Sequence, residues 1–63
     1  NDSLERLTEV DALKGQLVQL RFFAGLTLEQ AAVSLGISLS TAERHWAFAR
    51  AWLYNDLIDD KTD

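Results

Sequence analysis

The apolar residues of this chain recur three and four positions apart, which is the spacing of one face of an α-helix. No segment shows the alternation of apolar and polar residues that is typical of a half-buried strand. The sequence contains no proline and only three glycines, so its helical stretches are rarely interrupted. The pattern separates into four runs, and we therefore expect an all-α fold made of four helices.

Two short helices are predicted in the first half of the chain. The first is expected to be capped by Asp2 or Ser3. Its apolar positions are Leu4, Leu7 and Val10. The second is capped by Asp11, and its apolar face runs down toward the glycine that follows. The positions on that face are Leu13, Leu17, Leu20 and Phe23. Gly15 inside this helix is expected to cost about 1 kcal/mol relative to alanine, and Gly25 is expected to end the helix.

A helix-turn-helix is predicted at about residues 27–54, which makes the expected fold a small four-helix domain containing this motif. Thr27 and Gln30 form a capping-box pattern at the start of the third helix. Gly36 ends that helix, and Ser38 caps the next one. The apolar positions of the two helices are Leu28, Ala31, Ala32 and Leu35, then Leu39, Ala42, Trp46, Ala49, Leu53 and Leu57. The alanines among them allow two steeply crossed helices to approach closely.

The solvent side of the first turns of the fourth helix is a candidate DNA-binding surface. Its residues are Ser40, Thr41, Arg44 and Ala47, with Glu43 and Phe48 at the edges. Small side chains let a helix approach the floor of the major groove, and Arg44 is long enough to reach a guanine edge or a phosphate. The hydroxyl groups and the amides at the capped helix start suit phosphate oxygens. Glu43 can accept a hydrogen bond from a cytosine amino group, but it repels phosphate.

The same residues also have purely structural interpretations. Arg44 on a solvated helix face commonly contacts only water. His45 and Trp46 lie beside the core face of the helix, which favours packing over base reading. Phe48 and Trp52 either cover the second helix or form an exposed patch for a partner, and the pattern leaves both alternatives open.

Composition narrows the possible functions. The chain has 63 residues and a formal net charge of −4, so it is one small domain without the basic excess usual in a stand-alone DNA-binding protein. It lacks cysteine and has a single histidine, which excludes thiol chemistry and a multi-histidine metal site. No catalytic constellation, cofactor motif or membrane-spanning run is present. Because it starts with Asn1 rather than methionine, we expect the chain to be a piece of a longer protein.

The segment LRFFAGLTLEQAAVSLGISLSTAERHWAFARAWL, residues 20–53, resembles region four of the extracytoplasmic-function (ECF) sigma factors of bacterial RNA polymerase. The runs RFFAGLT and ARAWLYNDL are not general to helix-turn-helix domains, and with LERLTEVDALKGQLVQL the resemblance covers nearly the whole chain. It implies recognition of the minus-thirty-five promoter element by the helix that starts near Leu39. It also implies docking on the β flap of the polymerase core, a cytoplasmic location, no membrane contact and no enzymatic activity. An anti-sigma factor is a further implied partner.

At positions that match the family, the resemblance implies which residues face promoter DNA. They are Thr27, Leu39, Ser40, Thr41, Glu43 and Arg44, with Thr27 near the DNA backbone. Glu43 departs from many relatives, which have a basic residue there, and this weakens the expected phosphate contacts. The resemblance also accounts for the acidic composition, because core polymerase delivers a sigma factor to DNA and the module need not bind tightly alone.

Two other functions compete with this interpretation. A DNA-binding effector domain of a response regulator is also a four-helix module, but more Lys and Arg would be expected in its reading helix. A helical module that contacts only proteins is the second alternative. Its candidate contact residues are Phe22, Phe23, Phe48, Trp52 and Tyr54.

Overall fold

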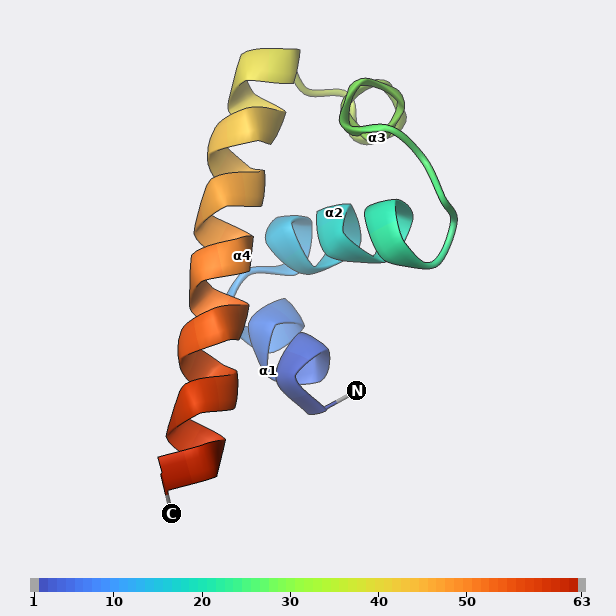
Figure 1. Cartoon of the computed structure of the whole chain (residues 1–63). Helices are drawn as coiled ribbons and strands as arrows, with labels where there is room; N and C mark the ends of the chain where they lie inside the picture. Colours follow the sequence, from blue (N-terminus) through green and yellow to red (C-terminus); the bar gives the residue numbers. More distant parts are fainter. Residues whose placement is uncertain (1, 63) are drawn as a thin grey trace.

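The structure, a computed structural model, describes the backbone of residues 2–62 and the side chains of residues 2–58. It contains four helices: α1 (Asp2–Val10), α2 (Ala12–Phe22), α3 (Leu28–Leu35) and α4 (Leu39–Thr62). No strand occurs within these residues, and the predicted all-α fold is confirmed. The helices follow the four runs of apolar residues in the sequence (Figure 1).

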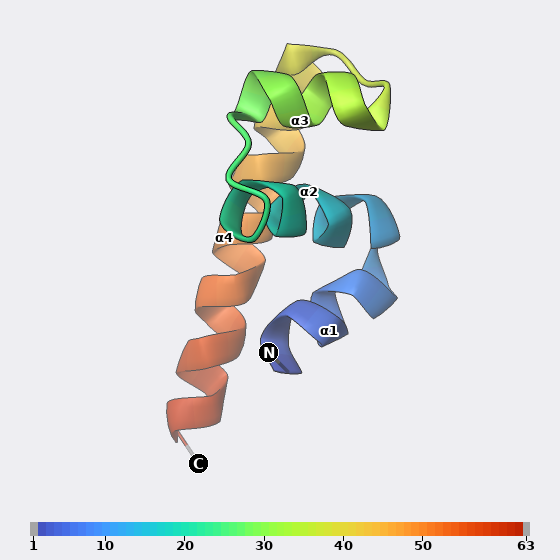
Figure 2. The same cartoon turned by 90° about the vertical axis from the view of Figure 1, so that its right-hand side faces the viewer.

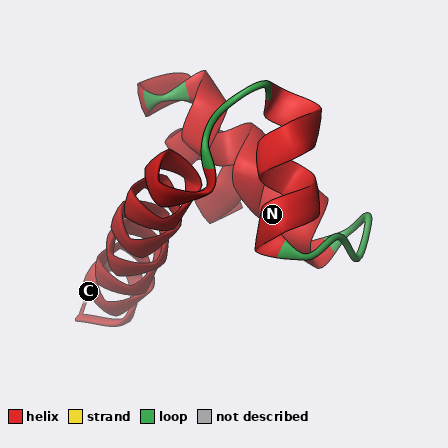
Figure 3. Cartoon of the chain, turned by 90° about the horizontal axis from the view of Figure 1, so that it is seen from above, coloured by secondary structure: helices red, strands yellow, loops and turns green. Residues whose placement is uncertain are grey.

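The long helix α4 forms one side of the molecule, and the three shorter helices lie against it (Figure 1). α3 lies at the start of α4, α2 at its middle and α1 farther along, and α2 contacts all three other helices. The view turned by 90° shows α3 side-on where Figure 1 shows it end-on, so α3 and α2 are steeply inclined to each other (Figure 2). Seen from above, the shorter helices gather on one side of α4 (Figure 3). This arrangement leaves much of α4 uncovered.

The predicted caps at the start of α2 and at both ends of α3 are confirmed. The Lys14 backbone N–H donates to Asp11 Oδ1 at 3.3 Å at the start of α2. Thr27 and Gln30 make both hydrogen bonds of a capping box, at 2.9 and 3.1 Å. Gly36 ends α3 in the left-handed conformation, with φ of 72°. These local hydrogen bonds satisfy helix-end groups that would otherwise lack partners.

The ends of α1 and α2 differ from the prediction. Ser3 is not a cap but a buried residue inside α1, where its hydroxyl donates to Asp56 Oδ2 on α4 at 2.6 Å. Gly25 does adopt a left-handed conformation, with φ of 73°, but α2 has already ended at Phe22. The Leu26 N–H reaches back to the Leu20 carbonyl at 3.0 Å, so Gly25 reverses the chain after the helix rather than ending it.

The core is centred on α1, α2 and the middle of α4. Its buried members are Leu4, Leu7, Val18 and Ala49, with Trp46, Trp52 and Leu53 packed against them. The prediction was wrong for Phe23, which is 74% exposed, because it lies beyond the last residue of α2. Leu57 is 51% exposed because it lies on the uncovered part of α4. Leu39, the first residue of α4, is 40% exposed.

At Gly15, helix α2 lies very close to α1. A Cβ atom built at this position would lie 2.2 Å from Thr8 Oγ1 and 2.8 Å from Thr8 Cα on α1. Only a residue without a side chain fits there. The predicted cost of this glycine within α2 therefore accompanies a packing requirement that the sequence did not reveal.

Candidate nucleic-acid interface

The turn between α3 and α4 positions the candidate interface. The Gly36 N–H donates to the Val33 carbonyl at 3.1 Å, and the Ile37 N–H donates to the Ala32 carbonyl at 3.0 Å. The chain then enters α4 two residues later. Where α3 contacts α4, the small side chains of Ala31, Ala32 and Ala42 are all buried. The tight turn and the small residues together give the close crossing expected for a helix-turn-helix.

Hydroxyl groups gather at the start of α4. The Thr41 N–H donates to Ser38 Oγ at 3.2 Å, which confirms the predicted cap. Ser38 Oγ in turn donates to Thr41 Oγ1 at 2.9 Å and lies 3.4 Å from Ser40 Oγ. Arg44 Nη2 donates to Thr41 Oγ1 at a long 3.5 Å. The Arg44 guanidinium is therefore held near the helix N-terminus, where the helix dipole and free N–H groups already favour anions.

The predicted site residues do not all belong to this cluster. Ser40, Thr41 and Arg44 are joined by the contacts above, and Leu39 and Glu43 lie on the same two exposed turns. Thr27 is exposed at the start of α3, and its side chain is engaged with Gln30. It therefore lies in a separate capping box, at a different helix end.

Behind this surface, Arg21 connects three parts of the chain. Its Nη1 donates to the Leu26 carbonyl at 2.9 Å, and its guanidinium carbon lies 5.1 Å from the centre of the Trp46 ring. The Phe22 ring is 5.6 Å from the Trp46 ring. Arg21 Nε is buried without a hydrogen-bond partner within the described residues. This role could not be predicted from the sequence, because one arginine near a helix end fits many environments.

Phe48 and Trp52, which could either cover the second helix or be exposed for a partner, differ in the structure. Trp52 is partly buried and packs against the core, as expected for a residue that covers neighbouring helices. Phe48 is 50% exposed, and Lys14 Nζ of α2 lies 4.8 Å from the centre of its ring.

An apolar groove of about 630 Å³ lies on another face of α4. Its lining residues are Phe22, Ala47, Arg50, Ala51, Leu53, Tyr54 and Leu57. Phe22 and Tyr54 are 65% and 66% exposed, which is high for aromatic side chains. Such a groove is suited to the apolar face of a partner helix. The exposed aromatic residues were predicted as candidates for partner binding, whereas Arg50 was not.

Two aspartates have structural partners. Arg6 donates to Asp56 at 2.6 Å, and this hydrogen bond, together with that from Ser3, holds the pKa of Asp56 below its ordinary value. Hydrogen bonds from the Lys14 side chain and backbone likewise lower the pKa of Asp11. No group of three or more metal-ligating side chains occurs in the part of the chain that the structure describes. Within the same part, no helix has the length and apolar character needed to cross a membrane.

Comparison with known proteins gives one match. The model of the family described as ECF sigma factor matches residues 1–59, which is nearly the whole chain. No curated protein and no solved structure matches the chain.

Proposed function

The chain belongs to the ECF sigma factor family, and we propose that it is the region-four-like module that binds the minus-thirty-five promoter element. Sigma factors recognise promoters together with RNA polymerase, so promoter DNA and the polymerase are the partners of this family, which is not a class of enzymes. In the proposal, residues 1–63 form one DNA-binding domain that acts in the cytoplasm. Its helix-turn-helix spans about residues 27–54.

The exposed start of α4 is the observation that carries this proposal. Ser40 and Arg44 are exposed; the Ser40 hydroxyl lies against that of the cap residue Ser38, and the Thr41 hydroxyl links Arg44 to the same cap. In the proposed complex the first two turns of α4 enter the major groove, where Arg44 reads a guanine edge or holds a phosphate. Leu39 and Glu43 flank it on the same turns, and Thr27 at the start of α3 contacts the backbone.

The charge of the domain favours weak binding by the isolated chain. With a net charge of −4 and Glu43 beside Arg44, few phosphates can be neutralised. When the module is held on a polymerase that already contacts the promoter, its own binding to DNA becomes intramolecular. This raises the effective concentration of the module at the promoter. A low affinity for free DNA is therefore consistent with promoter recognition by the assembled factor.

The apolar groove on α4 is the surface we propose for docking on the polymerase β flap. Tyr54 and Leu57 in this groove lie ten and thirteen residues beyond Arg44, which corresponds to roughly 15–20 Å along a helix axis. One partner can therefore occupy the far part of the groove while DNA occupies the start of the helix. An anti-sigma factor that used the same exposed aromatic side chains would compete with the polymerase.

The two exposed arginines of α4 provide a matched test. We would measure binding to a DNA duplex selected on this chain, at several salt concentrations, and binding to a peptide of the β flap-tip helix by amide-shift titration. Arg44→Ala should lower DNA affinity and reduce the salt slope by about one, because one phosphate contact is lost. Arg50→Ala removes the same charge from the groove and should weaken only the binding of the flap peptide. Tyr54→Ser should act like Arg50→Ala.

Three results would contradict the proposal. Equal losses of DNA affinity in both arginine variants would indicate general electrostatic attraction rather than a reading surface. Dimerisation with tight DNA binding and no flap binding would favour the response-regulator type of domain. Flap binding with no effect of Arg44→Ala on DNA would favour a module that contacts only proteins.

A further inference from the structure

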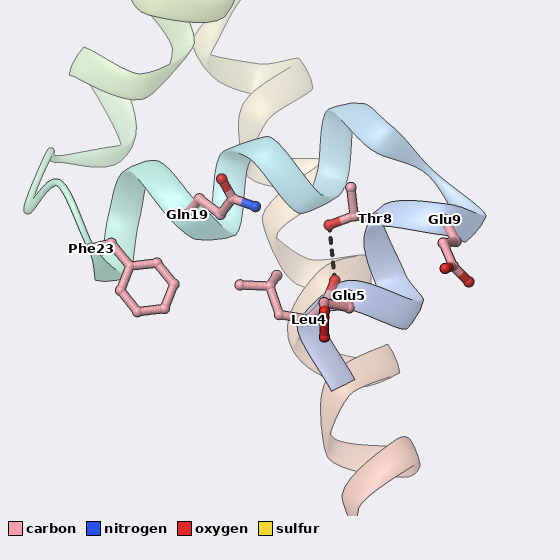
Figure 4. A pocket seen from close by; sticks show the side chains of 6 residues that line it. All are labelled: Leu4, Glu5, Thr8, Glu9, Gln19 and Phe23. Atoms are coloured by element: carbon pink, nitrogen blue, oxygen red, sulfur yellow. Dashed lines mark hydrogen bonds between the residues drawn. The ribbon is translucent and has the colours of Figure 1, made fainter. Parts of the chain in front are cut away.

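A second groove, distinct from both surfaces of α4, lies between α1 and the end of α2. It has a volume of about 460 Å³ and is lined by Leu4, Glu5, Thr8, Glu9, Gln19 and Phe23. Figure 4 shows that Leu4 approaches it from α1 and Phe23 from just beyond the end of α2, while the two glutamates lie along α1. We infer that this groove binds a basic amphipathic helix of a partner protein. The inference goes beyond promoter binding and does not depend on it.

The apolar part of the groove offers a place for one anchoring side chain. Phe23 is 74% exposed, more than any other aromatic residue that the structure describes, while Leu4 is only 9% exposed. A leucine or phenylalanine from a partner would lie between the Phe23 ring and Leu4. Interfaces commonly place such an apolar anchor at the centre and polar groups at the rim.

The rim of the groove determines the charge of the partner. Glu5 and Glu9 are exposed, one helical turn apart, and neither makes an ion pair with any described side chain. Like charges four residues apart on a helix repel each other. Lysines or arginines beside the apolar anchor would relieve this repulsion, whereas nucleic acid and anionic lipid would be repelled. The complementary partner is therefore basic.

The groove is already formed before any partner arrives. Gly15 holds α2 directly against Thr8 of α1, and the Thr8 hydroxyl donates to the Leu4 carbonyl at 2.8 Å. The contact of α1 with α2 at Gly15 and Thr8 thus does not use Glu5, Glu9 or Phe23. Binding would therefore cost conformational entropy mainly in the partner and little in this chain, which favours binding even when the contact area is modest.

A pair of designed peptides tests the inference. The first is a helical peptide of about 16 residues, long enough to fold in part by itself, with leucines on one face and lysines beside them. The second has glutamate in place of every lysine. Amide-shift titration of this chain with the lysine peptide should give saturable shifts at the groove residues. The glutamate peptide should give none there.

Single substitutions then show which groove residues contribute to binding of the lysine peptide. Glu5→Gln and Glu9→Gln should each weaken the lysine peptide about two- to fivefold, in the range of exposed ion pairs. Phe23→Ser should lower the affinity for the lysine peptide about tenfold, because the apolar anchor of the peptide no longer packs against the Phe23 ring. Glu29→Gln on α3 removes the same charge elsewhere and should change affinity less than twofold.

Several outcomes would overturn the inference. They are equal binding of the two peptides, shifts confined to the α4 groove, equal effects of Glu9→Gln and Glu29→Gln, or the same shifts with spermidine alone. The last would indicate attraction of any polycation. Because no DNA or polymerase is present in this experiment, its result is independent of the proposed promoter function.

Discussion

Replacing Gly15 by alanine should destabilise this domain, although alanine is the better helix former by about 1 kcal/mol. The new Cβ would lie 2.8 Å from Thr8 Cα, so α1 would have to withdraw by about 0.6 Å to reach ordinary contact at 3.4 Å. It would also displace Thr8 Oγ1, which donates to the Leu4 carbonyl. Overpacking costs about 1–3 kcal/mol and the lost hydrogen bond about 1 kcal/mol. After the gain in helix propensity, a net loss of about 1–3 kcal/mol remains.

Thermal unfolding followed by circular dichroism measures this effect directly. For a domain of this size, a loss of 1 kcal/mol lowers Tm by roughly 4–8 °C. Gln16→Gly, at the exposed neighbouring position, is the control because it reports helix propensity in α2 without a contact to α1. If Gly15→Ala raised Tm, as propensity alone predicts, the close approach of α1 and α2 would not exist in solution.

Two further changes test other contacts. Arg21→Lys keeps the charge but loses the planar group that reaches both the Leu26 carbonyl and the Trp46 ring, so it should lower stability by about 1 kcal/mol and shift the Trp46 indole resonance. An unchanged indole resonance would contradict the contact. Because Arg6 holds the pKa of Asp56 below its ordinary 3.8, the folded state gains stability above that value and loses it as the pH falls below about 4. Asp56→Asn should flatten this acid dependence of Tm, and an equally steep dependence in the variant would show that other groups cause it.

The four helices and most of their caps could be predicted from sequence because their signals are local. Asp11, Thr27 and Ser38 each satisfy an N–H group three residues away, and Gly36 supplies a backbone conformation that other residues disfavour. These interactions depend on neighbours in the chain and not on the tertiary structure. The exposed character of Ser40 and Arg44 followed in the same way from the helical period.

The packing between helices could not be predicted in this way. The period of a helix shows which residues share a face, but not which residue of another helix lies opposite. The close contact of Gly15 with Thr8 and the hydrogen bond from Ser3 to Asp56 join residues on different helices. The exposure of Phe23 has a similar cause, since it depends on where α2 ends and on what covers that end.

The cations of this acidic chain are unequally engaged by intramolecular partners. Five of the six Lys and Arg residues lie in the region whose side chains are described. Three of these have a carboxylate or an aromatic ring as intramolecular partner: Arg6 pairs with Asp56, Lys14 with Asp11, and Arg21 with the Trp46 ring. Arg44 and Arg50 are exposed and make no ion pair with a described side chain, and both lie on α4. An acidic chain can therefore offer two unpaired arginines on α4, although Glu43 beside Arg44 leaves the start of this helix close to neutral.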